Sequence, residues 1–313
     1  MEAVKLKAVG ILNELREVDF HHCFSQWKIC MERCRDCQGE YIEGHGPLTF
    51  AIPVKDYAHH YLVSYNNEII LIYWNAETDT NNHMLLKYDE IKLPPHEAIN
   101  YGIADPFGGL CFWTAKVDGS NTGKVFFFHL RYRTPRVIEL IIPGIPLSNG
   151  IVWHLNDRTK IYYCDGMNNR ILSYGYDPAT RRIIGNNGIA FDLDVWIRKR
   201  KRPLYKGHAM LGRMTIDIKG RLYVPLYGGS HVLQIDPHTQ GVLHTIHIPA
   251  VKVTACVFGG KDLNILYVSS MRCATNEKCP ATDQGGKIFA VPHLDDEMKG
   301  EKAMPFVLPY QPQ

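Results

Sequence analysis

The 313-residue sequence lacks any hydrophobic run long enough for a membrane helix. Apolar runs such as residues 125–128 are short, whereas a membrane-spanning helix needs about 20 such residues. The N-terminal 20 residues carry charges directly after a brief apolar part and have no small-residue cleavage site. We therefore expect no membrane partner and an unsecreted, cytoplasmic protein.

The sequence also lacks a strong charge of either sign. Its 35 Lys and Arg residues nearly balance 32 Asp and Glu residues, for a net charge of +3. That charge is too small to attract nucleic acid over the whole surface, so we expect no nucleic-acid partner. Residues 198–202 are an exception, because they are five consecutive cations. They are either a solvated loop or a contact for an acidic partner, a polyanion or the nuclear import machinery.

A disulfide framework is not indicated either. The nine cysteines are Cys23, Cys30, Cys34 and Cys37 near the N-terminus, and Cys111, Cys164, Cys256, Cys273 and Cys279. Their odd number and the apolar, strand-like surroundings of three of them predict reduced thiols, which favours the cytosol. The Cys23–Cys37 group, with His21 and His22 nearby, is either a zinc site or a loose cysteine-rich edge segment.

Hairpin-like segments recur along the chain. Apolar residues alternate, pass through Asp, Asn or Gly turns, and alternate again in residues 102–115, 150–165, 214–227 and 255–270. Asp-Pro turns at 177–178 and 236–237 separate further strand-like runs. We expect no amphipathic helix beyond the N-terminus. A hairpin about every 45 to 60 residues predicts an all-β, six-bladed β-propeller, with a two-sheet sandwich as the alternative.

The expected organisation is a divergent N-terminal segment, residues 1–40, and a propeller over 41–313, as a single domain overall. Inner strands of a propeller converge on one mouth, where function is expected. Asn100 and Asn149 are predicted in loops that directly precede two of the hairpins. Either residue could instead be a simple turn former.

Several motifs resemble one known family. They are S-N-G-I-V-W from Ser148, M-T-I-D-I-K-G-R-L-Y-V from Met214, F-G-G-K-D-L-N-I-L-Y-V from Phe258, and I-N-Y-G-I-A-D-P-F-G-G from Ile99. These segments resemble the senescence marker protein, gluconolactonase and luciferin-regenerating enzyme family, also called regucalcins. The resemblance covers most of the chain after about Tyr41. It implies a six-bladed propeller with one divalent cation, calcium or zinc, and hydrolysis of sugar lactones or related esters. Some members are discussed as calcium-handling proteins.

The resemblance also implies a chemistry. A hard cation held by oxygen ligands polarises the lactone carbonyl, and a neighbouring carboxylate activates water. Family ligands are the Glu of a Gly-Glu-Gly-Pro motif, the Asn of Ser-Asn-Gly, and the Asp of Pro-Asp-Gly, which is also the proposed general base. A further Asn, in Asn-Asp-Gly, holds the substrate.

Two of these positions are retained in this chain. Asn149 matches the metal ligand of Ser-Asn-Gly. Asn100 matches the substrate-binding residue, although Tyr101 replaces the acidic residue after it and Ala98 replaces an arginine before it.

Two carboxylates are missing by the same comparison. Gly212, between Leu211 and Arg213, stands where the Asp of Pro-Asp-Gly is expected, and residues 5–30 contain no Gly-Glu-x-Pro. Neutral carbonyls alone bind calcium weakly. We therefore expect a degraded site with weak or absent metal binding and activity.

Substitute ligands remain open at this stage. Glu97, His96 and His208 lie near the relevant segments, and imidazoles would suit zinc better than calcium. Glu14 or Glu17 could replace the first-strand carboxylate. The sequence thus leaves three functions: a lactonase-type carboxylic-ester hydrolase acting on a sugar lactone or ester, a non-catalytic binding or regulatory propeller, and a platform for an acidic partner at residues 198–202. It predicts no oligomeric state.

Overall fold

The computed structural model describes residues 50–65, 68–73, 85–90, 97–116, 125–131, 134–140, 148–292 and 297–308. Predictions on residues 1–40, the Cys23–Cys37 group, Glu14, Glu17 and His96 lie outside these ranges. The chain divides into two compact units. Of the described residues, those from 148 to 301 form one unit, and those before 148 together with 302–308 form the other.

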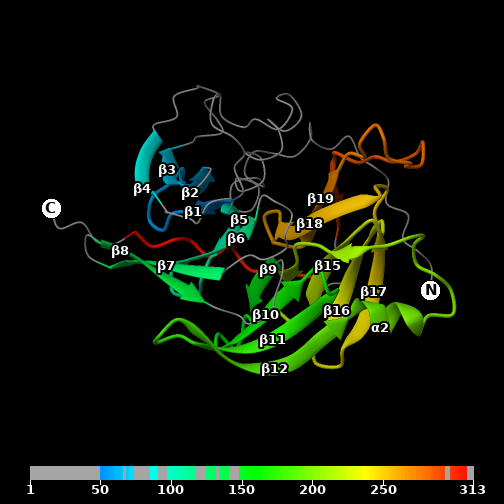
Figure 1. The fold of residues 1–313 in the computed structure, drawn as a ribbon, viewed down its shortest axis with the longest axis horizontal. Helices are drawn as coiled ribbons and strands as arrows, with labels where there is room; N and C mark the ends of the chain where they lie inside the picture. Colours follow the sequence, from blue (N-terminus) through cyan, green and yellow to red (C-terminus); the bar gives the residue numbers. More distant parts are fainter. Residues whose placement is uncertain are drawn as a thin grey trace. The chain divides into compact units, whose positions relative to one another are not determined.

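The unit with the described residues before 148 has two four-stranded antiparallel sheets, each a meander in chain order (Figure 1). The first has β1 (Ala51–Pro53), β2 (His60–Tyr65), β3 (Glu68–Tyr73) and β4 (Leu85–Glu90). The second has β5 (Glu97–Ala104), β6 (Leu110–Lys116), β7 (Val125–Arg131) and β8 (Thr134–Leu140). The C-terminal segment returns to the first sheet, where Phe306 N–H donates to the Pro53 carbonyl.

The other unit begins with a third four-stranded meander. It contains β9 (Ser148–Trp153), β10 (Lys160–Asp165), β11 (Arg170–Asp177) and β12 (Arg182–Asp192). The Asp-Pro turn predicted after β11 is present. The Asp177 carboxylate stabilises it by accepting a hydrogen bond of 2.9 Å from Ala179 N–H. Asp236 caps the equivalent turn through His238 N–H, also at 2.9 Å.

The remaining strands form one eight-stranded sheet made of two meanders. The first has β13 (Met210–Leu211), β14 (Thr215–Ile216), β15 (Leu222–Tyr227), β16 (His231–Asp236) and β17 (Gly241–His247). The second has β18 (Lys252–Gly259), β19 (Ile265–Met271) and β20 (Ile288–Val291). The two meanders are joined by the pair of Tyr227 with Lys252 and by an isolated parallel bridge between Arg213 and Ala255.

The predicted all-β class and the four hairpins are confirmed. β5–β6, β9–β10, β14–β15 and β18–β19 cover the four repeated segments. The described residues contain five meanders, one in each four-stranded sheet and two in the eight-stranded sheet. Within each unit, buried aliphatic and aromatic side chains fill the space between meanders, as Leu211, Leu222 and Phe191 do in residues 148–301. Six blades remain a prediction.

One helix was not expected from the sequence. α2 (Leu193–Arg198) follows β12, and the Asp192 carboxylate caps it by accepting from Val195 N–H at 2.8 Å. Six residues make less than two turns, so no amphipathic period could reveal this helix. Within the described ranges, no helix has the length and hydrophobicity needed to cross a bilayer.

The cysteine prediction was partly wrong. Cys111, Cys164 and Cys256 are buried thiols in strands, as expected. Cys273 and Cys279 instead form a disulfide. The cause is local, because the intervening turn brings their Cα atoms within 6.4 Å, a separation that a disulfide can span.

Candidate functional site

Four of the five described meanders carry one extra residue at a recurring position on their first-strand side. In β5, Asn100 lies between Ile99 and Tyr101, whose partners on β6 are adjacent residues. In β9, Asn149 and Gly150 together lie opposite the single residue Cys164. An extra residue of this kind is a β-bulge, which redirects a side chain and is frequent beside active sites.

The next two meanders repeat the feature. Residues 212–214, between β13 and β14, span the gap opposite only two residues of β15. In β18, Thr254 lies between Val253 and Ala255, whose partners on β19 are also adjacent residues. The bulges thus contain Asn100, Asn149 and Gly212, which are the three positions carried over from the family, and also Thr254. The sequence prediction missed Thr254, although it directly precedes the repeated segment that starts at Ala255.

Three of these bulges are in direct contact within residues 148–301. The Asn149 amide donates a hydrogen bond of 2.6 Å to the Leu211 carbonyl. Arg213 pairs in parallel with Ala255, and Arg213 N–H donates to the Thr254 carbonyl at 3.0 Å. The inner strands of three consecutive meanders therefore meet at their bulges. Asn100 belongs to the other unit.

Neither asparagine lies in a loop, so that prediction was wrong. Asn100 is inside β5 and Asn149 is inside β9. The bulge explains why these two strand residues were predicted in loops. An extra residue in a strand interrupts the regular pairing, and such an interruption is also expected of a loop.

Asn149 is held in one orientation. One N–H of its Nδ2 donates to Leu211, which orients Oδ1 as the acceptor that it can offer to a cation or a substrate hydroxyl. Gly166 makes room for this side chain, since a Cβ at Gly166 would lie 1.9 Å from Nδ2 and 3.0 Å from the Leu211 carbonyl oxygen.

Gly212 has little space for a side chain. A Cβ there would lie 2.5 Å from the Thr254 carbonyl oxygen and 3.3 Å from that of Pro225. Its backbone is also engaged, because Gly212 N–H donates to Pro225 O at 2.7 Å and Cys164 Sγ contacts Gly212 O at 3.6 Å. Burial raises the pKa of the Cys164 thiol, which therefore stays protonated and can donate. An Asp at this position would require the backbone to move.

The groups at these bulges do not fit a calcium ion. Asn149 supplies one neutral oxygen, while the Thr254 hydroxyl is engaged with that of Ser269 at 2.5 Å. Gly212 supplies no side chain, and Arg213 brings a positive charge. Calcium requires six to eight oxygen ligands, with carboxylates among them. Across the bulges of β9, β13–β14 and β18, no residue is a carboxylate.

A carboxylate does occur one strand away from the β9 bulge. Asp165 pairs with Ser148 and is buried. Its two oxygens accept hydrogen bonds from Asn168, at 3.2 Å from the backbone N–H and 2.8 Å from the side-chain amide. Asp165 therefore closes the turn between β10 and β11, a structural role that the sequence D-G-M-N-N indicates.

The substitute ligands stay predictions. His208 is exposed in the segment before β13. Glu97 is the first residue of β5, and its side chain is outside the description.

Known proteins resemble the chain over most of these elements. A family model described as SMP-30/Gluconolactonase/LRE-like region matches residues 27–272. The chain is 30% identical over 197 residues to "Putative sugar lactone lactonase YvrE" of Bacillus subtilis, a match covering 61% of each chain. It is 27% identical over 219 residues to regucalcin of Xenopus laevis, covering 67% of this chain and 65% of that protein. The matches thus span less than two thirds of these relatives' length.

Two solved structures resemble the fold. A luciferin-regenerating enzyme superposes with a TM-score of 0.70 at 24% identity, covering 84% of this chain and 82% of the other. Regucalcin of Agrobacterium tumefaciens, described as a calcium-binding protein, gives a TM-score of 0.65 at 19% identity, covering 84% and 80%. With the antiparallel meanders, these neighbours establish a β-propeller fold. The chain belongs to the SMP-30/gluconolactonase/LRE-like family.

Proposed function

We propose that this protein binds a sugar lactone or related ester at the inner-strand bulges, and hydrolyses it slowly or not at all. The main support is the composition of the bulges, where Asn149 is kept while Gly212 stands at the position of the family's general base. An amide can hold a substrate oxygen but cannot take a proton from water. The proposal includes no calcium-dependent step, because the bulges of β9, β13–β14 and β18 contain no carboxylate.

The first-strand ligand position supports the same proposal. The family match begins at residue 27, which leaves Glu14 and Glu17 outside it. Residues 44–47 read Gly-His-Gly-Pro, which differs from Gly-Glu-Gly-Pro in one residue. We infer that His45, outside the described residues, replaces the first-strand Glu. An imidazole there would favour zinc over calcium, but it would not restore the lost negative charge.

The testing experiment measures opening of D-glucono-1,5-lactone by proton release. Purified protein is treated with EDTA and assayed again with calcium, zinc or manganese, beside a family member that carries Pro-Asp-Gly. Loss of a general base lowers the rate by about 100-fold to 10,000-fold, so we expect turnover at least about 100-fold below that of the relative. Metal-dependent turnover equal to the relative's would contradict the proposal.

Binding is measured separately, because a protein without turnover can still hold the ligand. Calorimetric titration with a non-hydrolysable lactam of the same sugar should give an affinity that Asn149→Ala weakens. Asn156→Ala is the matched control, since Asn156 is an exposed asparagine in the turn between β9 and β10. Equal lactam affinities in the wild type and Asn149→Ala would show that the ligand does not bind at this bulge.

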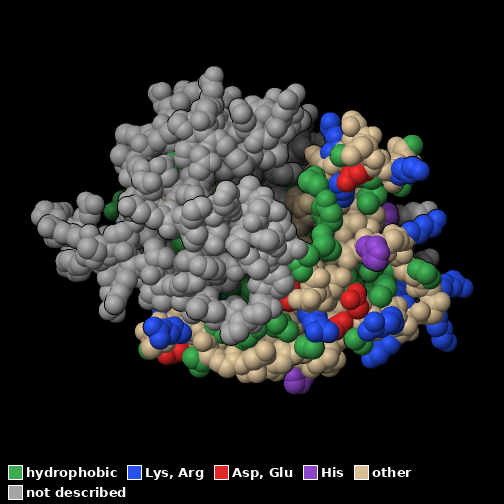
Figure 2. All heavy atoms as spheres, viewed as in Figure 1, with side chains coloured by type: hydrophobic (Ala, Val, Ile, Leu, Met, Phe, Trp, Pro, Cys, Tyr) green, Lys and Arg blue, Asp and Glu red, His purple; other side chains and the backbone are tan. Residues whose placement is uncertain are grey.

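A second candidate function rests on residues 198–202. All five are exposed, and in Figure 2 Lys and Arg side chains gather on the side where α2 lies. Arg200 stacks on Trp196 at 4.7 Å, which holds one cation at the surface. An acidic partner should therefore bind in a salt-sensitive way, and replacing Lys199, Lys201 and Arg202 with Gln should abolish that binding without changing lactam affinity. The measurement is the affinity for a polyglutamate probe. An affinity that changes neither with salt nor with these substitutions would exclude this role.

A further inference from the structure

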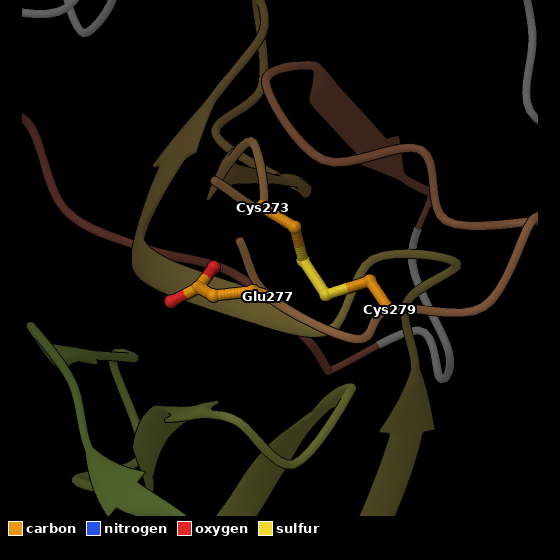
Figure 3. Close-up of side chains that lie close together, drawn as sticks. All are labelled: Cys273, Glu277 and Cys279. Atoms are coloured by element: carbon orange, nitrogen blue, oxygen red, sulfur yellow. A yellow bond between two sulfur atoms is a disulfide. The ribbon is translucent and has the colours of Figure 1, made fainter. Parts of the chain in front are cut away.

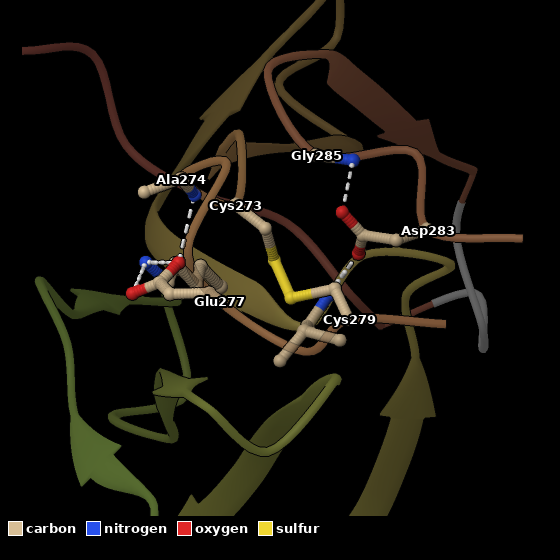
Figure 4. The surroundings of a disulfide bond; sticks show 8 residues. Cys273, Ala274, Glu277, Cys279, Asp283 and Gly285 are labelled. Carbon is tan, nitrogen blue, oxygen red and sulfur yellow. Dashed lines mark hydrogen bonds and ion pairs between the residues drawn. A yellow bond between two sulfur atoms is a disulfide. The ribbon is translucent and has the colours of Figure 1, made fainter. Parts of the chain in front are cut away.

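The loop after β19 contains a disulfide that no proposed function uses. Cys273 and Cys279 are linked, which closes a ring of seven residues (Figure 4). The loop leaves from Met271, the partner of Lys252 at the start of β18. Because the bulges also lie near the starts of the inner strands, the ring is at the same end of this unit as the Asn149 bulge.

The second half of the loop is anchored without the disulfide. The Asp283 carboxylate accepts hydrogen bonds from Val251 N–H at 2.7 Å and Gly285 N–H at 3.2 Å. Gln284 N–H donates to the Pro249 carbonyl at 2.8 Å. Opening the disulfide would therefore leave these attachments in place, and the change would be confined to residues 273–279.

Glu277 connects the ring to the sheet. Its carboxylate accepts from Ala274 N–H at 2.8 Å and pairs with the Lys252 ammonium. Lys252 is nearly buried, with 11% of its side chain exposed, against 39% for Glu277. These contacts hold the carboxylate beside the two sulfur atoms, and one carboxylate oxygen and both Sγ atoms lie within 4.8 Å of one another (Figure 3).

Two thiolates and a carboxylate are ligands that zinc accepts, and three protein ligands leave a fourth position for water. Tetrahedral zinc with Zn–S bonds of about 2.3 Å needs sulfur atoms about 3.8 Å apart, so the cleaved pair must separate by roughly 2 Å. Both cysteines are half-buried, which leaves them accessible to a small reductant, whereas Cys111, Cys164 and Cys256 are buried.

We propose that reduction of the Cys273–Cys279 disulfide turns this ring into a zinc site, with the two thiolates and the Glu277 carboxylate as ligands. A small dithiol reductant supplies two electrons and two protons, becomes its own cyclic disulfide, and leaves two thiols. Zinc then replaces the two thiol protons, which pass to solvent. The Glu277 carboxylate then leaves its ion pair with Lys252 and binds the zinc. This frees the Lys252 ammonium at the same end of the unit as the bulges.

The test is zinc binding by the full-length chain, reduced with a phosphine and assayed under argon against a chromophoric chelator. Reduced wild type should bind one zinc per chain more than the Cys273→Ser/Cys279→Ser double variant. Subtraction removes any zinc held by the Cys23–Cys37 group, which both proteins contain. Cobalt in place of zinc should add a thiolate charge-transfer absorbance that the double variant lacks.

Two single variants separate a ligand from a structural role. Glu277→Gln should weaken zinc binding by about 10-fold or more, since it removes an anionic ligand. Lys252→Met removes the same ion pair but no ligand, so it should bind zinc at least as tightly as wild type. Circular dichroism confirms that each variant is folded.

Equal zinc stoichiometry in reduced wild type and the double variant would overturn the proposal. So would equal binding by oxidised and reduced wild type, or equal weakening by Glu277→Gln and Lys252→Met. Because no turnover is measured, failure here leaves the lactone proposal untouched.

Discussion

The Asn149 side-chain amide donates a 2.6 Å hydrogen bond to the carbonyl oxygen of Leu211, 62 residues away in the chain. This contact joins the bulge of β9 to the end of β13, directly before Gly212. It fixes which atom Asn149 offers to a ligand. The geometry of this contact gives the first prediction.

Gly166→Ala should displace the Asn149 side chain while leaving residue 149 an asparagine. The new methyl group would lie 1.9 Å from Asn149 Nδ2, so one of the two must move. We expect a loss of about 1–3 kcal/mol in the free energy of unfolding, measured by urea denaturation. The control is the Gly166→Ala/Asn149→Ala double variant, in which the clash is removed. If the two losses simply add, Asn149 is not the residue that the methyl group displaces.

Gly212→Asp should fail to restore a catalytic base. The Cβ alone meets the Thr254 carbonyl oxygen at 2.5 Å, so Gly212→Ala and Gly212→Asp should both destabilise the protein by about 1–3 kcal/mol. Lactone opening should stay at the wild-type level in both. A Gly212→Asp protein of unchanged stability that gained metal-dependent turnover would contradict this description of the bulge.

Asp217 organises the turn between β14 and β15. Its buried carboxylate accepts from Lys219 and Arg221 N–H groups, from Arg221 Nε at 2.6 Å, and from the Tyr223 hydroxyl at 3.2 Å. Burial raises the pKa of Tyr223, which keeps the hydroxyl a donor. Arg221→Ala should cost about 3 kcal/mol, because it leaves a buried charge without its cation. Tyr223→Phe removes a neutral donor to Asp217 and the acceptor of the buried Gln234 amide, so it should cost about 1–2 kcal/mol in the same denaturation assay. Equal losses in the two variants would argue against the charge effect.

His231 should make stability depend on pH. Burial lowers its pKa, and the nearby His247 and Arg200 lower it further, whereas the hydrogen bond to the Gly229 carbonyl acts in the opposite direction. The imidazole of His231 therefore binds a proton near pH 6.5 in the unfolded chain, whereas in the folded chain it stays neutral to a lower pH. The free energy of unfolding should be at its full value above that pH and should fall as the pH drops below it.

His231→Asn is the matched variant for this prediction. The Asn amide can still donate toward Gly229, the contact that Nδ1 makes at 2.7 Å, but it does not titrate. The decrease in stability between pH 7 and pH 5 should be smaller in the variant. A small dependence will persist through His154, whose pKa is also lowered by burial. An unchanged slope would exclude His231 as its source.

The disulfide should contribute modestly to stability. Closing a ring of seven residues restricts the unfolded chain by about 2 kcal/mol, so Cys273→Ser/Cys279→Ser should lower the free energy of unfolding by roughly that amount in metal-free buffer. Reduced wild type should match the double variant under the same conditions. A reduced protein as stable as the oxidised one would show that the ring contributes no cross-link effect.

Much of the fold could be predicted from local pattern. Alternating residues and Asp-Pro turns give hairpins because each strand pair is closed by a turn a few residues long, as Asp177 and Asp236 illustrate. The short helix α2 was not predicted, because six residues give no periodic signal. Thr254 directly precedes its repeated segment as Asn149 does, but only the pairing register shows that both residues lie in bulges.

The sequence by itself determined the hairpins, the family motifs and the glycine at position 212, since these depend on residue identity and short-range order. Only the tertiary structure decided that Asn149 points its amide at Leu211, that a side chain at Gly212 would meet Thr254, and that Glu277 lies beside the joined cysteines. The first two depend on contacts between neighbouring meanders, and the third depends on how one loop folds back onto Lys252. Turn chemistry is local, whereas such contacts form only when the sheets pack together.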